Sequence, residues 1–221
     1  MFPERFSESQ VKELEHSLGT YATAGQLQQR PAPDGGGIFR NEWWKYYTLL
    51  PSPDVREMWI YADTAQKTGQ DNDWSVFQLW AATKSGQVYL VDQTRGKWEA
   101  PELLVQARAF WLKHKAQYKR LRGMKVEDKS SGIGLIQTLK REGVPVLPIP
   151  RSRDKRERAY DVTPMIESGQ VYLPERAEFL ADLLAELSSF PNGSHDDQVD
   201  PLMDAISDLS LGDQGFNWGS V

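Results

Sequence analysis

Acidic residues gather at three places in the chain, and each place borders a run of apolar side chains. One follows the apolar residues 58–62, one follows residues 124–126, and one precedes the apolar positions of a helix expected near the C-terminus. Two unit charges 4 Å apart repel by about 4 kcal/mol at an effective dielectric constant of 20, and a divalent cation between them removes that cost. The pattern is therefore compatible with a metal site as well as with helix capping. The three groups are Asp63; Glu127 with Asp128; and Asp196, Asp197 and Asp200.

The chemistry that suits such a site is phosphodiester hydrolysis. Two divalent ions about 4 Å apart, bridged by one carboxylate, bind both the attacking water and the leaving oxygen. The chain has no cysteine and three histidines, so its ligands would be carboxylates, carbonyls, waters or imidazoles. This set favours hard cations such as Mg²⁺ or Mn²⁺.

Each acidic position also has a purely structural explanation. An aspartate at a helix N-terminus, such as Asp196, caps the helix more often than it binds a metal. Asp63 fits a turn at the end of a strand, and Asp71 and Asp73 fit the organisation of a loop. His195 is interpreted as an exposed neighbour of the cap. The choice between metal and cap depends on how the remaining chain folds.

Length and composition indicate a folded, soluble protein with one main domain. The 221 residues are 39% hydrophobic and include 8 Trp, 8 Tyr and 8 Phe, which is too apolar for a disordered chain. No stretch approaches the roughly 18 apolar residues of a membrane span. The N-terminus lacks the basic and apolar regions of a secretory signal, so we expect no export.

Two basic segments contrast with the formal net charge of −5. Residues 113–125 carry six Lys or Arg and no acidic residue, and residues 151–158 carry five more. Local basic charge can hold the phosphates of a nucleic acid even on an acidic chain, although the first segment also fits a solvated helix face. The predicted DNA contacts are Lys115, Lys119, Arg120, Arg122, Arg151, Arg153 and Lys155.

The apolar pattern predicts an α/β fold. A capped helix at 7–18 and a Pro/Gly-rich linker at 28–39 come first, followed by an antiparallel meander of three strands at 57–65, 75–83 and 87–94. Helices and strands then alternate. The later elements are a helix from about 100 to 121, a strand at 124–128, a helix after 132, a strand at 144–149, a helix around 162–166, the segment 170–174, and helices at 175–190 and 197–209. The domain boundaries that follow are 1–40 for the first helix and linker, 41–211 for the main domain and 212–221 for a loose tail.

This order places the acidic groups at the ends of elements. Asp63 follows the first strand, Glu127 follows the apolar part of the fourth, and Asp197 begins the last helix. The carboxyl ends of adjacent parallel strands share one crevice in an open sheet. If the first and fourth strands are neighbours, Asp63 and Glu127 converge there.

Four segments, by their order and spacing, resemble the nuclease domain of the large terminase subunit of tailed bacteriophages. They are GTYATAGQLQQRPAPDGGGIF (19–39), YADTAQKTGQDNDWSV (61–76), VEDKSSGIGLIQTL (126–139) and FPNGSHDDQVD (190–200). The family has a ribonuclease H-like fold, in which helices flank a five-stranded mixed sheet. Its acidic residues lie on the first strand, the fourth strand and the last helix, which is the order found here.

The resemblance assigns roles to the acidic residues. It implies that Asp63 bridges two Mg²⁺ or Mn²⁺ ions, that Asp128 is a possible substitute for its neighbour Glu127, and that Asp200 is an auxiliary ligand. Capping by Asp196 or Ser194 would accompany metal binding. The predicted catalytic residues are Asp63, Glu127 and Asp197. The predicted metal ligands are Asp63, Glu127, Asp128, Asp196, Asp197 and Asp200.

Two features depart from the family pattern. Family members normally carry a packaging ATPase, but the chain has no G-x-x-x-x-G-K-[ST] motif, so we expect a nuclease fragment, a split protein or a prophage remnant. Pro201 directly follows Asp200, which disfavours helical geometry at Asp200. If the helix begins at Asp197, the proline lies in the first turn and is tolerated.

The resemblance implies a metal-dependent DNA endonuclease that cuts concatemeric phage DNA during genome packaging, in the host cytoplasm. Its partners would be double-stranded DNA, the packaging ATPase domain, the small terminase subunit and the portal, with no membrane. Sequence specificity should be weak, because phosphate contacts position a duplex without reading it. The alternatives are a resolvase-like nuclease of the same fold, and a noncatalytic DNA-binding or assembly module of the packaging machine.

Overall fold

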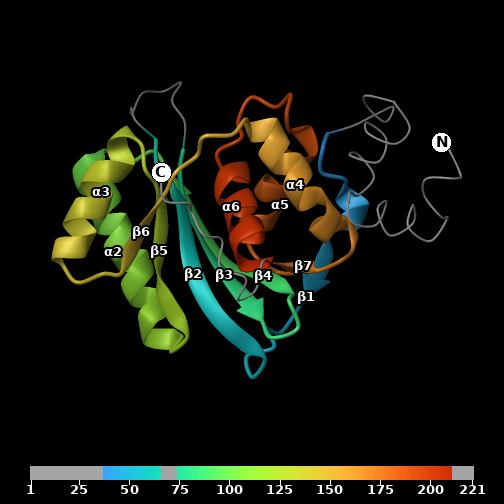
Figure 1. The fold of residues 1–221 in the computed structure, drawn as a ribbon, viewed down its shortest axis with the longest axis horizontal. Coiled ribbons are helices and arrows are strands. Elements are labelled where there is room, and N and C mark those ends of the chain that lie inside the picture. Colours follow the sequence, from blue (N-terminus) through green and yellow to red (C-terminus); the bar gives the residue numbers. More distant parts are fainter. Residues whose placement is uncertain (1–36, 66–73, 211–221) are drawn as a thin grey trace, which may run out of the picture.

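The computed structural model describes residues 37–65 and 74–210, which form a mixed sheet of seven strands between two layers of helices (Figure 1). The strands are β1 (Lys45–Tyr47), β2 (Val55–Asp63), β3 (Ser75–Thr83), β4 (Val88–Gly96), β5 (Leu121–Glu127), β6 (Val146–Ile149) and β7 (Val171–Pro174). Their order across the sheet is β1-β7-β4-β3-β2-β5-β6. β2, β3 and β4 form the expected antiparallel meander. β5 runs parallel to β2 and β6 parallel to β5, while β7 runs parallel to both β4 and β1.

Helices cover both faces of the sheet (Figure 1). They are α2 (Ala100–Gln117), α3 (Ser130–Arg141), α4 (Lys155–Glu167), α5 (Leu180–Ser189) and α6 (Val199–Ser210), with a short 3-10 helix η2 (Asn41–Trp43) before β1. α2 and α3 pack on one face, and α4, α5 and α6 pack on the other. Among the helices of the described ranges, none combines the length and the apolar character needed to cross a membrane.

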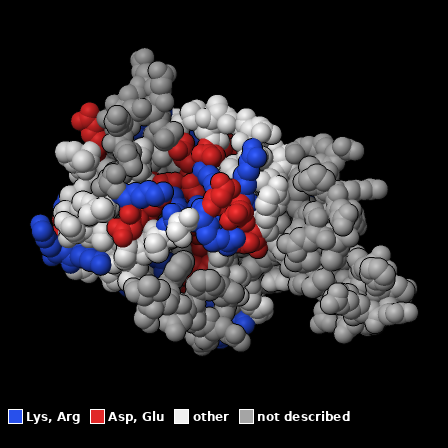
Figure 2. All heavy atoms as spheres, turned by 45° about the horizontal axis from the view of Figure 1, so that its top comes forward, with Lys and Arg blue, Asp and Glu red and all other residues white. Residues whose placement is uncertain are grey.

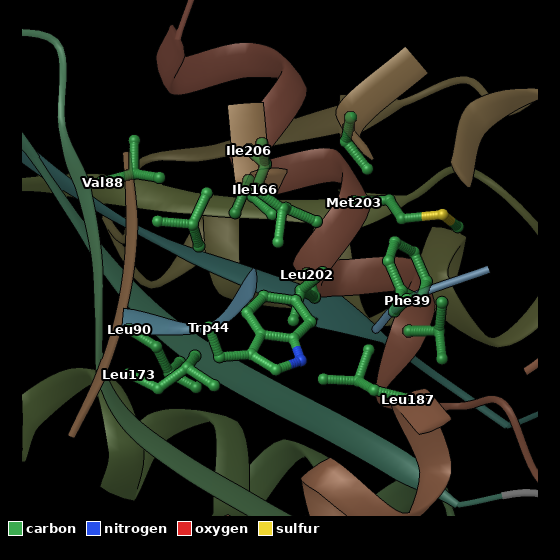
Figure 3. Packing of buried hydrophobic residues seen from close by; sticks show 14 of the residues in the cluster. Phe39, Trp44, Val88, Leu90, Ile166, Leu173, Leu187, Leu202, Met203 and Ile206 are labelled. Carbon is green, nitrogen blue, oxygen red and sulfur yellow. The ribbon is translucent and has the colours of Figure 1, made fainter. Parts of the chain in front are cut away.

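Two apolar cores separate the sheet from its helix layers. Trp44, Leu187 and Leu202 belong to the core under α4, α5 and α6 (Figure 3), and each is at most 3% exposed. Phe77 and Leu139 belong to the core under α2 and α3, and both are fully buried. β3 contributes to both cores, and all nine of its residues are buried. This burial on two faces explains why its sequence is a nearly continuous apolar run.

The first described residues belong to the packed domain. Ile38 and Phe39 are 3% and 1% exposed, and the backbone N–H of Ile38 donates to the carbonyl of Phe190 at 2.9 Å. The last residues of the segment expected to be a linker therefore pack into the core. The helix expected at 7–18, the rest of that linker, the loop acids Asp71 and Asp73, and the tail at 212–221 lie outside the described residues.

Several expected elements differ from the observed ones. The sheet has seven strands rather than five, because β7 and β1 extend it beyond β4. The helix expected to reach residue 121 ends at Gln117, because Leu121 enters β5 and is buried in the sheet at 1% exposure. The final helix begins at Val199 rather than at Asp197, and α5 begins at Leu180 rather than at 175.

A close backbone contact at the start of α3 holds the end of β5. Gly132 is buried, and a Cβ atom at this position would lie 2.0 Å from the carbonyl oxygen of Glu127. Gly134, two residues later, has open space around the same position. Glycine at 132 therefore allows α3 to approach the strand end that carries Glu127.

We expect Gly132→Ala to lower the free energy of unfolding by about 1–3 kcal/mol, because the new methyl group must displace backbone. Gly134→Ala is the matched control and should raise it by up to about 1 kcal/mol through helix propensity. Urea unfolding of both variants measures the difference. Equal stabilities for the two variants would contradict the close contact between Gly132 and Glu127.

Candidate active site

Three parallel strands end at one edge of the sheet, and each brings a charged side chain there. β2 ends with Asp63 and β5 ends with Glu127, and the register of the two strands makes these residues neighbours. β6 pairs Ile149 with Glu127, so Arg151 follows two residues later at the same edge. The structure thus brings Asp63 and Glu127 together, as expected for the ends of adjacent parallel strands.

Arg151 links these carboxylates to one another. Its Nη1 atom lies 3.1 Å from Asp63 Oδ2, 2.9 Å from Glu127 Oε2 and 3.7 Å from Asp200 Oδ2. Its Nε and Nη2 atoms donate to Asp204 Oδ2 at 3.0 and 2.8 Å. The Arg151 side chain is only 5% exposed, so carboxylates rather than water balance its charge.

The start of α6 brings further acidic residues to this edge. Asp200 lies in the first turn and Asp204 one turn later, so both side chains lie on the same face of the helix. Pro201 is the third residue of the helix, where its missing N–H would have no intrahelical partner. Asp197 precedes the helix and lines the same cavity as Asp63. Asp200 is therefore helical, despite the proline that follows it.

A buried network of glutamine side chains and one glutamate holds the start of α6. The side chain of Gln198 donates to Glu186 Oε2 and accepts from Gln93 Nε2, both at 2.6 Å. Its backbone N–H donates to Glu186 Oε1 at 2.6 Å, and its carbonyl accepts from Gln78 Nε2 at 3.1 Å. Breaking such a network is costly, because buried polar groups lose their partners. The acidic residues on either side of Gln198 are thereby held in place.

Two cations from the start of α4 face the acidic residues of α6. Lys155 Nζ lies 2.7 Å from Asp200 Oδ2 and 2.8 Å from Asp196 Oδ1. Arg158 reaches Asp200 Oδ1 at 2.7 Å with Nη1 and Asp204 Oδ1 at 2.6 Å with Nη2. These ion pairs connect α4 to α6 beside Arg151.

Burial and neighbouring charges shift the pKa values of the acids in different directions. Burial raises the pKa of Asp63 to about 7, against the lowering effect of Arg151. Burial also raises the pKa of Asp204, although Arg151 and Arg158 act in the opposite direction. For Asp200, burial is outweighed by the neighbouring cations, Arg151 first, so its pKa is lowered. The pKa values of these two neighbouring carboxylates are therefore shifted in opposite directions, upward for Asp63 and downward for Asp200.

The charged side chains surround an open cavity of about 590 Å³ at the carboxyl edge of the sheet. Figure 2 shows acidic and basic side chains side by side on one face of the molecule. The cavity is lined by Asp63, Glu127, Lys129, Arg151, Arg153, Lys155, Asp197 and Asp200, among others.

The carboxylates suit a hard divalent cation by chemistry, but their present arrangement is built around Arg151. Within residues 37–65 and 74–210, no three acidic or histidine side chains are already grouped closely enough to hold a metal ion. The carboxylate oxygens are nevertheless the ligand type that Mg²⁺ prefers. Asp63 and Glu127 would help to hold such an ion, and their oxygens now contact the Arg151 guanidinium.

Two predicted metal ligands lie away from the centre of the cavity. Asp128 is exposed and does not line it, whereas the Glu127 side chain is 12% exposed and does. The strand register therefore turns Glu127, and not Asp128, toward Asp63. Asp196 lies at the rim with a side chain that is 48% exposed. The His195 side chain is 47% exposed, in keeping with its interpretation as an exposed residue next to Asp196.

Residues 113–122 of the first basic segment lie toward the opposite end of β5 from Glu127, whereas Lys125 is two residues from Glu127 and pairs with Asp208. Arg122 is the second residue of this strand, about 17 Å from Glu127 along it at roughly 3.3 Å per residue. Lys115 and Arg120 donate to backbone carbonyls at that far end of the sheet. The structure therefore does not bring the first segment to the acidic cavity. Of the predicted DNA contacts, it brings there only Arg151, Arg153 and Lys155.

Three charged residues of this region were not among the sequence predictions. Asp204 pairs with Arg151 and with Arg158, and Lys129 Nζ lies 2.8 Å from Glu127 Oε1. The four-residue spacing between Asp200 and Asp204 was a signal for Asp204, because such residues share a helix face. Arg158 is the last residue of the second basic segment, 151–158, and Lys129 had no comparable signal, since basic residues are common on solvated faces as well.

A mixed sheet with carboxylates at the ends of two parallel strands and on the last helix defines a ribonuclease H-like domain. The chain matches the family model described as the terminase RNaseH-like domain over residues 60–209, and it belongs to this family. No curated protein matches the chain in sequence. The ribonuclease H-like fold and the terminase resemblance predicted from the sequence are confirmed.

Solved structures of large terminases share the fold at low sequence identity. A large terminase from a thermophilic bacteriophage, in complex with ADP, aligns with a TM-score of 0.70 and 14% identity, covering 94% of this chain and 53% of that chain. The large terminase nuclease from the thermophilic phage G20c with bound magnesium aligns with a TM-score of 0.57 and 18% identity, covering 79% of this chain and 98% of that chain. The form with bound cobalt gives a TM-score of 0.55 at the same identity and coverage. The chain thus spans about half the length of the ADP-bound terminase.

We expect Asp63→Asn to raise the melting temperature of the metal-free protein at about pH 8 and to change it little at about pH 5. The folded chain holds the Asp63 proton up to a pH of about 7, whereas the unfolded chain releases it near 3.8. The free energy of unfolding therefore falls as pH rises through this window, and asparagine avoids the loss. The gain at pH 8 should be roughly 2–4 kcal/mol.

Thermal unfolding in chelator at both pH values measures this effect. Asp128→Asn is the matched control, because Asp128 is exposed beside the same strand end. A stability difference for Asp63→Asn that is the same at both pH values would contradict the raised pKa.

Proposed function

We propose that the chain is the metal-dependent DNA endonuclease of a phage packaging terminase and cuts concatemeric DNA by phosphodiester hydrolysis. The observation that carries the proposal is the meeting of carboxylates from β2, β5 and the start of α6 at one open cavity. Basic side chains line the same cavity, including Lys129 and Arg153. Membership of a terminase domain family supports the same conclusion.

Two Mg²⁺ or Mn²⁺ ions are the cofactors in this proposal, and Asp63, Glu127, Asp197 and Asp200 would hold them. The bound magnesium and cobalt of the similar G20c nuclease support a divalent cation. When bound, such ions activate a water molecule and stabilise the leaving oxygen. Asp128 is left out of the set because it is exposed and does not line the cavity.

The protein's own contribution is to hold the carboxylates and to position the DNA backbone. The contact with Gly132 holds Glu127, and the amide network of Gln198 holds the acids at the start of α6. Lys129 and Arg153, with side chains 58% and 56% exposed, are placed to meet phosphates approaching the cavity. Contacts of this kind carry no sequence information, so the cutting should be weakly specific.

The proposed setting is the packaging machine in the host cytoplasm. The chain spans about half of a similar large terminase whose structure was determined in complex with ADP. A packaging ATPase domain is therefore the first partner in the proposal. The small terminase subunit and the portal are further partners, because packaging brings the cutting of DNA together with its translocation.

The purified chain should nick and then linearise supercoiled plasmid in Mn²⁺ or Mg²⁺ and leave it intact in chelator. Asp63→Asn and Glu127→Gln should each slow cleavage at least about a hundredfold, because each removes a proposed ligand. Asp128→Asn is the control for the strand register and should retain cleavage. Gel electrophoresis of the plasmid over time measures these rates.

Two outcomes would contradict this proposal, and each would support one of the alternative functions. DNA binding that is equal with and without metal, together with an intact plasmid, would make the chain a noncatalytic DNA-binding or assembly module. Preferential cutting of a four-way junction over a linear duplex of the same sequence would make it a resolvase-like nuclease.

The two basic regions make different predictions for the salt dependence of DNA binding. Each phosphate contact contributes a slope of about −0.9 to log affinity against log salt concentration. In an Asp63→Asn background, replacing Lys129 and Arg153 by alanine should flatten the slope by about 1.8. Replacing Lys119 and Arg122 by alanine is the matched control and should leave it unchanged.

Fluorescence anisotropy with a labelled duplex at several salt concentrations measures both slopes. If alanine at Lys119 and Arg122 flattens the slope and alanine at Lys129 and Arg153 does not, the duplex lies at the opposite end of the sheet. The proposed DNA path over the cavity would then be wrong.

A further inference from the structure

Arg151 lies at the centre of the acidic cavity rather than at its rim. Its Nη1 atom is within 3.1 Å of both Asp63 and Glu127, and its side chain is 5% exposed. The sequence suggested a phosphate contact for this residue, but such a contact would require an exposed guanidinium. An arginine also keeps its charge over the whole pH range of a folded protein. The carboxylates therefore always have a cation among them.

The position of Arg151 follows from the sheet and not from a chance side-chain rotation. β6 ends at Ile149, which pairs with Glu127, so the chain leaves the sheet beside the acidic strand ends. Pro148 and Pro150 flank Ile149 and restrict the backbone there. The chain is thereby directed so that the guanidinium reaches both strand ends.

A divalent cation and Arg151 need the same oxygen atoms. Mg²⁺ binds carboxylate oxygens at about 2.1 Å and demands a regular arrangement of ligands around it. Asp63 Oδ2 and Glu127 Oε2 already face Nη1 at 3.1 and 2.9 Å. A metal ion held by Asp63 and Glu127 would bind the oxygens that Nη1 now contacts, so the two cations compete for them.

The Arg151 guanidinium has space to rotate within the same region of the fold. It borders a separate cavity of about 400 Å³, whose lining includes Asp161, Asp204 and Asp208. Its Nε and Nη2 atoms are already held by Asp204 at 3.0 and 2.8 Å. A rotation into this cavity breaks the contacts of Nη1 and keeps the pair with Asp204.

We propose that Arg151 is the built-in counter-cation of the site: it competes with divalent cations for Asp63 and Glu127, and Asp204 retains it nearby when they displace it. This inference rests on the proposed metal-dependent function. Arg151 is thus a positioning residue that keeps the carboxylates together before metal binds. The same contacts lower the affinity of the site for metal.

The first test is Mn²⁺ binding to the full chain, measured by isothermal titration calorimetry. Arg151→Gln should bind Mn²⁺ at least about tenfold more tightly than the wild type, because charge-assisted hydrogen bonds to the ligands no longer have to be broken. Arg156→Gln is the matched control, since Arg156 is exposed in the first turn of α4. It should bind like the wild type, and Asp63→Asn should lose binding.

The second test is the melting temperature with and without Mn²⁺. Without metal, Arg151→Gln should melt below the wild type, because buried carboxylates lose their counter-charge. In saturating Mn²⁺ this difference in melting temperature should disappear, since the bound ions neutralise the same carboxylates and stabilise the folded state. If Arg151 had a merely structural role, the difference in melting temperature between variant and wild type would be the same with and without Mn²⁺. Arg156→Gln should match the wild type in both conditions.

If Arg151→Gln does not fold, Arg151→Lys provides a second test of the competition. It retains the charge, but a single ammonium group cannot contact the carboxylates and Asp204 in the fork geometry of arginine. Its Mn²⁺ affinity should lie above that of the wild type, by a smaller factor than for Arg151→Gln. An unchanged or weaker affinity in this variant would overturn the inference.

The outcomes separate this inference from the proposed function. If the wild type binds Mn²⁺ and neither Arg151 variant binds it more tightly, the proposed competition is wrong. The proposal of a metal-dependent nuclease is then unaffected. No Mn²⁺ binding by any of the proteins overturns both. Binding that is tighter in the Arg151 variants, with a difference in melting temperature that disappears in Mn²⁺, supports both the competition and the metal site.

Discussion

The structure of this domain depends on one constraint: three parallel strands end at the same edge of the sheet, two of them with a carboxylate. The register of β2 against β5 makes Asp63 and Glu127 neighbours. Their mutual repulsion, and the cost of burying Asp63, must be offset by a cation. β6 supplies that cation in Arg151, from the next strand along the sheet. The shared end of three parallel strands thereby creates a site in which buried carboxylates and a buried arginine stabilise one another.

The start of α6 is held by an equally restrictive arrangement. Gln198 is fully buried and engages Gln78, Gln93 and Glu186 through its backbone and its side chain. A shift of α6 by even one residue would break several of these hydrogen bonds inside the core. The polar network therefore explains how acidic residues from a helix stay aligned with acidic residues from strands. The helix also tolerates a proline there, because the N–H groups of its first turn have no intrahelical partners.

The sequence by itself determined the class of fold and the three places where acidic residues meet the core. Apolar periodicity was sufficient for the meander and for most helices, because local pattern reflects which faces are buried. It could not separate helix from strand at 118–122, where the burial of Leu121 in the sheet decided the outcome. It also could not reveal β1 at the sheet's edge, because a strand of three residues has no clear period.

Only the tertiary structure decided which charged residues share the site. Glu127, the last residue of β5, lines the cavity, whereas Asp128 directly after the strand is exposed, and a shift of one residue along the strand would reverse them. Asp204 and Arg151 are 53 positions apart in the chain, yet they are paired in the fold. Ion pairs between distant segments depend on distances in space, which spacing along the chain does not specify. For that reason the sequence indicated carboxylates that need a cation, and only the folded chain showed that one of its own arginines provides it.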